Sequence, residues 1–188
     1  IEYISQHYEV TALSEPTNFG TKGLYKYLRE SKLLNNKHIP NEYLTSGVEQ
    51  RLELLKGLMD TDGSISKNSS CEFTQSEEIL AKQVYHLIVS LGMKAKISSR
   101  IPVNSKTKIK GKLNWRIIFR PTTQVFKFPR KAERLSLNGN QFSKRFHRTI
   151  KKVQEIPSTP MRCITVDSEK SMYLCGTQMV PTRNSRTA

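Results

Sequence analysis

The chain has 188 residues, enough for one ordinary domain or for pieces of two. It carries 31 lysines and arginines against 16 acidic residues, a formal net charge of +15, whereas solubility alone needs a net charge of about 2–8. This surplus favours a polyanion such as nucleic acid as partner, because each neutralised phosphate releases condensed counterions. The longest apolar run, Val84–Leu91, is too short to cross a bilayer, which excludes a membrane-spanning protein.

The three cysteines, Cys71, Cys163 and Cys175, cannot all pair and show no CxxC spacing. They therefore exclude a disulfide framework and a zinc site, and they fit a reducing compartment. Ile1 stands where an initiator methionine would be, so we expect a fragment or a processed product.

The apolar pattern predicts alternating helices and strands after a loosely alternating segment, residues 1–20, that ends in turn-forming residues. Helical spacing predicts helices at Leu24–Leu34, Asn41–Leu44, Val48–Met59, Ser76–Leu91 and around Arg130–Leu137. Strands are predicted at Ser64–Ile65, Cys71–Thr74, Lys94–Ser99 and Trp115–Phe119. From Thr149 onward the pattern changes to strands broken by prolines and turns, which predicts a boundary near residues 140–148.

The helix that begins at Val48 stops in an unusual run, Leu55–Gly63, with the sequence LKGLMDTDG. Gly57 inside this helix costs about 1 kcal/mol of helix propensity, so its missing side chain should allow close contact with another helix. The run resembles the signature of the LAGLIDADG homing endonucleases at nearly every position. Asn36–Pro40 and Phe128–Leu135 resemble the segments that precede and close the second repeat of these nucleases, so the resemblance covers roughly residues 20–137.

This resemblance implies a nuclease that cuts double-stranded DNA with the help of Mg²⁺. Asp62 would be the catalytic residue and a metal ligand, placed where the equivalent acid of a second repeat lies close by. Asp60 would be a helix-terminal residue of lesser importance. The sequence contains one such motif, so the first repeat would come from a missing N-terminal part or from another copy.

The DNA would lie against basic side chains on the strand-like segments and on the loop between them. The resemblance and the charge pattern predict nucleic-acid contacts for Lys106, Lys108, Lys110, Lys112, Arg116, Arg120 and Lys131. For Lys131 two interpretations stay open: a lysine that steadies phosphate charge, and a solvated surface lysine.

The end of the chain resembles the last two sequence blocks of inteins, which are self-splicing protein insertions. Arg162–Ser168 and Tyr173–Gly176 lead to Asn184 followed by Ser185. The Ser185 hydroxyl would receive the upstream flank as an ester, and the Asn184 amide would attack its own carbonyl and cut the chain after itself. Residues 185–188 would then belong to the host protein.

Cys163 and Thr182 match a minority of inteins, called class three, in which the cysteine itself attacks the upstream splice junction. The alternative for Cys163 is a small buried core residue, which is the interpretation we adopt for Cys175. Arg183 stands where inteins normally have a histidine. It cannot shuttle a proton, although it can polarise the carbonyl under attack.

Together these patterns predict an α+β fold: one LAGLIDADG half of αββαββα order, followed by the β-rich C-terminal part of a Hint splicing domain. The predicted parts are the end of a first repeat or a linker (1–20), the nuclease repeat (21–142), the splicing segment (147–184) and host residues (185–188). The predicted function is protein splicing combined with site-specific DNA cleavage, in the cytoplasm of a prokaryotic or phage-infected cell. Two alternatives stay open: a maturase-like module that binds DNA or RNA without cleavage, and a stand-alone homodimeric nuclease.

Overall fold

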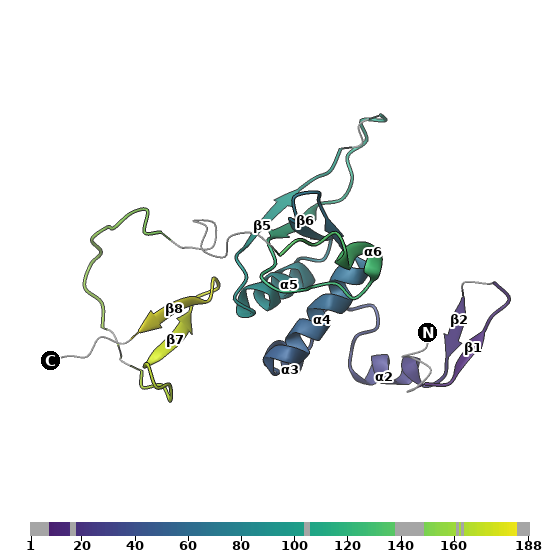
Figure 1. The fold of residues 1–188 in the computed structure, drawn as a ribbon, viewed down its shortest axis with the longest axis horizontal. Coiled ribbons are helices and arrows are strands. Elements are labelled where there is room, and N and C mark those ends of the chain that lie inside the picture. The colour runs from purple at the N-terminus through teal and green to yellow at the C-terminus, as the bar shows by residue number, and fades with distance from the viewer. Residues whose placement is uncertain are drawn as a thin grey trace.

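The structure is a computed structural model that describes residues 8–15, 18–103, 106–137, 149–160, 162 and 164–183. Its helices are α2 (Leu24–Glu30), α3 (Asn41–Leu44), α4 (Val48–Thr61), α5 (Glu78–Ser90) and α6 (Pro129–Ala132). Its strands are β1 (Val10–Ala12), β2 (Phe19–Thr21), β3 (Gly63–Ile65), β4 (Cys71–Gln75), β5 (Ala95–Arg100), β6 (Asn114–Phe119), β7 (Met172–Cys175) and β8 (Val180–Arg183). Figure 1 shows a central body of α4, α5 and a sheet, with the β1–β2 and β7–β8 hairpins on opposite sides of it.

The central sheet has four antiparallel strands in the order β3-β4-β6-β5. Side chains alternate between its two faces. In β4, for example, Phe73 is fully buried while Glu72 and Thr74 are only partly covered. In the register of the sheet, Thr74 lies opposite Arg116, which in turn lies opposite Ser98. One face of the sheet is therefore apolar and the other is polar and partly charged.

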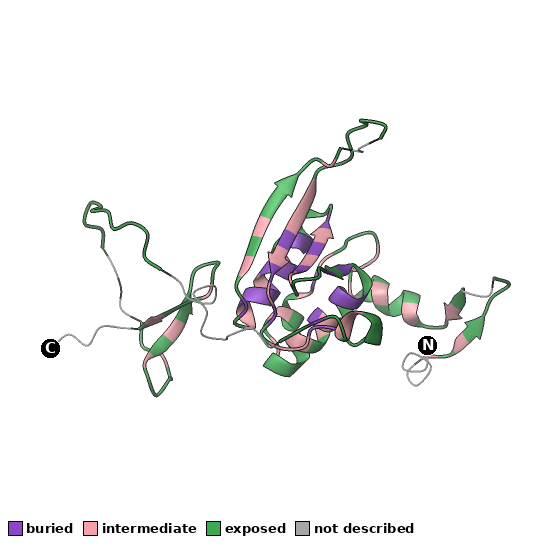
Figure 2. Cartoon of the chain, turned by 45° about the horizontal axis from the view of Figure 1, so that its top comes forward, coloured by how far each residue is buried: buried purple, intermediate pink, exposed green. Residues whose placement is uncertain are grey.

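Helices α4 and α5 cover the apolar face of the sheet, and each contributes one apolar stripe. Figure 2 shows the buried residues concentrated in these helices and in the strands beneath them. Large side chains with no exposed surface come from both layers: Leu55, Met59, Phe73, Val84, Leu87, Ile88 and Ile117. Because burying such a side chain contributes about 1.5–3 kcal/mol, this two-layer core stabilises the domain.

The element order α4-β3-β4-α5-β5-β6-α6 is the αββαββα order expected from the sequence, and the mixed α+β class is confirmed. The boundary predicted near residues 140–148 lies outside the described residues. Within the described part of the chain, no helix combines the length and the hydropathy that a membrane crossing requires.

Helix α5 (Glu78–Ser90) is slightly shorter than the predicted Ser76–Leu91, and two other helices end four or five residues before their predicted ends. Helix α2 ends at Glu30 instead of Leu34, because Lys32 has a φ angle of 56°, in the left-handed region that a right-handed helix cannot contain. Helix α6 ends at Ala132 instead of Leu137, because the chain beyond it turns to bond with the β3–β4 hairpin.

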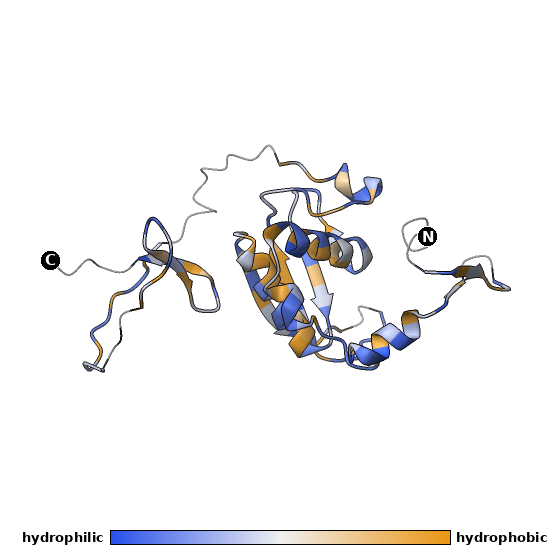
Figure 3. Cartoon of the chain, turned by 90° about the horizontal axis from the view of Figure 1, so that it is seen from below, coloured by the Kyte–Doolittle hydropathy of each residue, from blue (hydrophilic) through white to orange (hydrophobic). Residues whose placement is uncertain are grey.

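The C-terminal hairpin β7–β8 is a two-stranded sheet whose described side chains are mostly exposed, apart from Met179 in its turn, which packs against the core. Cys175 is exposed in this hairpin, so the prediction that it is a core residue is wrong. Residues 149–160 have no regular structure and carry three strongly exposed apolar side chains, Ile150, Val153 and Ile156. Figure 3 shows hydrophobic residues on this hairpin as well as in the core. Of the strands predicted in this region, the described residues form β7 and β8.

Cys71 in β4 is buried, and burial raises the pKa of its thiol to about 12. The reactive thiolate is therefore scarce at neutral pH. We expect iodoacetamide to label Cys175 in the native protein and to leave Cys71 unlabelled, as mass spectrometry of the labelled peptides would show. In urea both cysteines should react. Equal labelling rates for the two in the native protein would show that the β4 side of the core is open to solvent.

Candidate active site

Helix α4 ends in a tight turn built around one glycine. Its apolar stripe places Met59 in the core, and Asp62 closes the helix with its N–H 3.0 Å from the carbonyl oxygen of Leu58. Gly63 then begins β3 directly. A Cβ atom at Gly63 would lie 2.6 Å from the Met59 carbonyl oxygen, closer than real Cβ atoms approach. Glycine at this position therefore lets the strand start immediately beside the helix.

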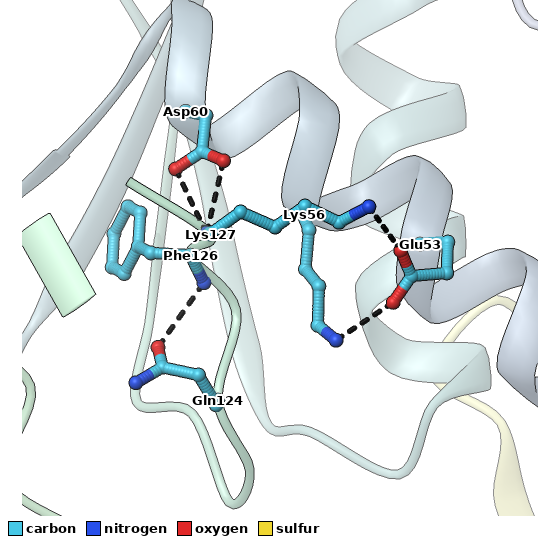
Figure 4. Close-up of polar contacts among 6 residues, drawn as sticks. All are labelled: Glu53, Lys56, Asp60, Gln124, Phe126 and Lys127. Atoms are coloured by element: carbon cyan, nitrogen blue, oxygen red, sulfur yellow. Dashed lines mark hydrogen bonds and ion pairs between the residues drawn. The ribbon is translucent and has the colours of Figure 1, made fainter. Parts of the chain in front are cut away.

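The two aspartates of this turn have different surroundings. The Asp60 side chain is nearly buried, and its carboxylate accepts the backbone N–H of Lys127, at 2.9 and 3.2 Å from the two oxygens, and that of Phe128 at 3.3 Å. Figure 4 shows Asp60 facing the backbone at Lys127. The Asp62 carboxylate is exposed and makes no hydrogen bond or ion pair within the described part of the chain. Asp62 is therefore the carboxylate at this helix end that can reach a ligand, whereas Asp60 binds the backbone.

A magnesium ion would need more ligands than this turn provides. Among the residues that the structure describes, no three His, Cys, Asp or Glu side chains group closely enough to hold a metal ion. Mg²⁺ is usually bound by one or two carboxylates in octahedral geometry, and Asp62 offers one hard oxygen donor. These residues do not form a metal site by themselves, and Asp62 fits such a site only as one contributor.

Lys131 lies against the same turn from the side of α6. Its Nζ donates to the carbonyl oxygens of Met59 at 2.9 Å, Asp60 at 2.7 Å and Gly63 at 2.7 Å. Burial lowers the pKa of this ammonium group and Arg130 lowers it further, while the neighbouring aspartates raise it. The interpretation of Lys131 as a solvated surface lysine is therefore wrong. Its role as a phosphate contact stays a prediction.

A second set of contacts holds residues 124–128 along α4. Glu53 accepts from Lys127 Nζ at 2.5 Å and from Lys56 Nζ at 2.7 Å (Figure 4). Both contacts lower the pKa of the Glu53 carboxyl, that of Lys127 most strongly. Gln124 Oε1 accepts the Phe126 N–H at 3.1 Å. The Lys127–Glu53 pair is exposed, so it contributes only about 0–1 kcal/mol to keeping this segment on the helix, whereas the Lys56–Glu53 pair lies within α4.

The outward side of α4 is open around Gly57. Among the described residues, and apart from the adjoining residues and backbone of α4 itself, no atom lies within 4 Å of the position that a Cβ of Gly57 would occupy. Leu54 and Leu58, on the same helix, are only partly buried and border an open apolar hollow together with Tyr43. The close approach of a second helix that the sequence predicts at Gly57 is thus sterically possible.

The polar face of the sheet carries a cross-strand ion pair. Arg116 in β6 donates to the carboxylate of Glu72 in β4, and the Thr74 hydroxyl donates to the same carboxylate at 3.3 Å. The contact with Arg116 is the main cause that lowers the pKa of Glu72. Arg116, one of the predicted DNA contacts, therefore already has an acidic partner in the free protein.

The other predicted DNA contacts lie at the edges of this face. Arg120 follows the last residue of β6 and borders a shallow hollow on the sheet. The connection between β5 and β6 extends beyond the sheet (Figure 1) and carries exposed lysines, namely Lys106, Lys108, Lys110 and Lys112. A single bridge between Val103 and Lys110 pairs the two sides of this connection.

Two further basic residues, which belong to a predicted basic strand but were not named as DNA contacts, lie on β5. Lys96 pairs in register with Ile118 and Arg100 pairs with Asn114, which places both on the face of Arg116. Strict alternation along β5 could have identified them, since residues two apart on a strand share a face.

The predicted splicing residues are only partly described. Thr182 lies in β8 opposite Tyr173, and its hydroxyl donates to the carbonyl oxygen of Val180 at 3.1 Å. Cys163, Asn184 and Ser185 lie outside the described residues. The described part of the chain therefore shows the strand that leads to the predicted splice junction, and not the junction.

Residues 49–151 match the LAGLIDADG-like domain family. The chain belongs to this family. The match includes α4, the Asp62 turn, the whole four-stranded sheet and α6, which are the parts that carry the LAGLIDADG site described above.

The chain also resembles a curated protein from Mycobacterium intracellulare, the replicative DNA helicase DnaB. The two are 35% identical over 166 residues, which cover 84% of this chain. The same alignment covers 27% of the helicase, so the chain spans about a quarter of the length of the curated relative it matches.

Replacing either of the two motif glycines by alanine should change the free energy of unfolding, and the two changes should have opposite signs. Gly63→Ala should lower the free energy of unfolding by about 1–3 kcal/mol, because its Cβ collides with the backbone of Met59. Gly57→Ala should raise it by about 1 kcal/mol, because alanine favours the helix and meets open space. Urea unfolding of both variants and the parent chain measures the difference. A neutral Gly63→Ala would refute the tight-turn geometry.

Proposed function

We propose that this chain is part of an intein, and that it combines one repeat of a homing endonuclease with the downstream end of a protein-splicing module. The nuclease part would cut double-stranded DNA, and the splicing part would join the flanks of a host protein. The observation that carries the proposal is the exposed Asp62 carboxylate at the end of α4 in a LAGLIDADG-like domain.

The polar face of the sheet supports a role in DNA binding. Lys96 and Arg100 lie on that face beside Arg116, and the lysines of the β5–β6 connection continue the basic surface beyond it. The net charge of +15 would add electrostatic attraction to this binding, since phosphate neutralisation releases counterions. Strand side chains on such a face would contact base edges and phosphates, whereas the flexible lysine stems of the connection suit phosphates alone.

The outward side of α4 supports a second repeat. Gly57, Leu54 and Leu58 present a partly apolar surface with no side chain at its centre, which suits close packing against an equivalent helix. Such packing would bring a second acid near Asp62. Mg²⁺ bound between the two acids would supply charge neutralisation at the scissile phosphate, with Asp62 as this chain's ligand.

The similarity to a helicase supports the intein assignment. A LAGLIDADG-like segment that aligns with a quarter of a protein named as a DNA helicase fits an insertion within that helicase. The C-terminal region also fits a module that needs more chain, because Ile150, Val153 and Ile156 are exposed and, among the described residues, β7 and β8 pair only with each other. The missing N-terminal splicing part would supply the strands that cover them.

The splicing chemistry would use four residues of this C-terminal region. The Cys163 thiolate would attack the carbonyl at the upstream junction, forming a thioester and releasing the amine. The Ser185 hydroxyl would take the acyl group as an ester and return the thiol. Asn184 would then cyclise to a succinimide and free the flanks, with Thr182 beside the junction.

Some of these observations also fit two other functions. A maturase-like module would bind DNA or RNA through the same basic face without cutting it, and it would not need Asp62 or Asn184. A stand-alone homodimeric nuclease would use Asp62 and not the C-terminal strands. Cleavage that requires Asp62 rules out the former, and splicing that requires Asn184 rules out the latter.

Asp62→Asn in the complete nuclease should abolish strand cleavage and leave the DNA dissociation constant within about twofold, because a metal ligand is lost while the basic face is kept. Plasmid nicking with Mg²⁺ and a filter-binding titration over several salt concentrations measure both effects. Asp167→Asn, the same change at another exposed aspartate, serves as the control and should cut normally. Undiminished cleavage by Asp62→Asn would remove Asp62 from the site.

Cys163→Ala in the complete intein should block splicing and the branched intermediate, because the first thioester cannot form. Asn184→Ala should let the branched species accumulate, because only the final cyclisation is lost. Cys175→Ala is the matched control, an exposed cysteine that should leave splicing intact. Gel analysis of precursor, branched and spliced products distinguishes these outcomes. Normal splicing by Cys163→Ala would make Cys163 a structural residue.

A further inference from the structure

We propose that Asp60 and Lys131 form a reciprocal cap between α4 and α6, and that this cap positions Asp62. Asp60, at the end of α4, accepts the backbone N–H groups of Lys127 and Phe128, which lead into α6. Lys131, inside α6, donates to the carbonyls at the end of α4. Helix α6 thus supplies a side chain to the end of α4, and α4 supplies one to the two residues that lead into α6.

The charge of each capping side chain is opposite to the partial charge of the backbone groups that it binds. The last carbonyls of a helix carry partial negative charge, and the N–H groups at a helix start carry partial positive charge. The Lys131 ammonium binds the Met59 and Asp60 carbonyls, and the Asp60 carboxylate binds N–H groups. Helix α6 has only four residues and could not persist without such contacts.

The three carbonyl groups that Lys131 binds belong to residues on both sides of Asp62 in the sequence. Met59 and Asp60 precede it and Gly63 follows it, so one ammonium group fixes the backbone on both sides of the Asp62 side chain. The Asp62 N–H is itself bonded to the last turn of α4. The direction of the Asp62 carboxylate therefore depends on the position of Lys131.

The hydrogen-bonding capacity of Lys131 is fully used by this cap. A lysine ammonium has three N–H donors, and three backbone carbonyls lie within 2.9 Å of Nζ. No donor is left for a phosphate while these contacts persist. Lys131 is thus a positioning residue that acts through the backbone, in contrast to the lysines of the β5–β6 connection.

The segment that carries Lys131 is anchored further along the turn and the hairpin. Arg134 donates to the Ile65 carbonyl oxygen at 2.9 Å, and the Ser136 N–H donates to Ser69 Oγ at 3.0 Å. These bonds keep residues beyond α6 on the β3–β4 hairpin, so Lys131 is held at the turn from both directions.

Amide hydrogen exchange of this chain tests the cap without DNA or metal. Lys131→Met should speed exchange of the Asp62, Lys127 and Phe128 amides by about tenfold relative to the amides of β4 and β6, because local opening becomes easier. Arg130→Met removes the same charge from the neighbouring exposed residue of α6 and should change these rates by less than about twofold. Unchanged exchange in Lys131→Met would overturn the proposed cap. If Lys131→Met does not fold, Asp60→Asn, which weakens the opposite half of the cap, should raise the same three rates.

Cleavage by the complete nuclease tests the positioning role, which rests on the proposed function. Lys131→Arg keeps the charge but spreads its donors over a planar fork that cannot converge on three carbonyls. As a positioning residue, Lys131→Arg should cut at least about tenfold more slowly than the parent while its DNA affinity and its salt dependence stay unchanged. Parent-like cleavage by Lys131→Arg, or a smaller salt slope in Lys131→Met, would assign Lys131 to phosphate instead. If the parent protein does not cut DNA at all, the nuclease function fails, and the exchange experiment still decides whether the cap exists.

Discussion

The arrangement of this domain depends on the close approach between the last turn of α4 and the first residue of β3. Gly63 is buried against the backbone of Met59, at a distance that leaves no room for a side chain. This contact sets where the sheet begins relative to the helix that covers it. It also leaves Asp62 as the single residue between the two elements, with its backbone held and its side chain exposed. A fixed backbone with a free carboxylate is what a site for a polar ligand requires.

Several charged residues in this domain are engaged by other parts of the chain. Lys131 binds three carbonyls, Asp60 binds two amides, and Arg116 is paired with Glu72. The net charge of the chain therefore overstates the number of basic groups that can turn to a phosphate. A Glu–Arg pair on a basic sheet face also makes that face uneven in charge, which would favour some base edges over others. In the proposed complex with DNA, affinity and discrimination between sequences would thus have different sources on this surface.

The C-terminal region is stabilised differently from the LAGLIDADG-like repeat. The repeat buries a two-layer core, whereas β7–β8 is a two-stranded hairpin, and an isolated hairpin is at best marginally stable in water. Met179 in its turn packs against the core of the repeat, and most of its other apolar side chains are exposed. Further strands that cover these side chains would stabilise the hairpin, as the proposed splicing module requires.

The sequence alone determined the helices and strands of the repeat, their αββαββα order and the Asp62 turn, because hydrophobic period, turn residues and the glycine–aspartate motif are local signals. The end of α6 and the contacts of Lys131 were decided by tertiary structure. These features depend on which distant segment lies nearby, and no local period encodes that. A lysine in sequence is a positive charge in any context. Its position beneath three carbonyls, which changes what that charge can do, exists only once α6 has folded back onto the end of α4.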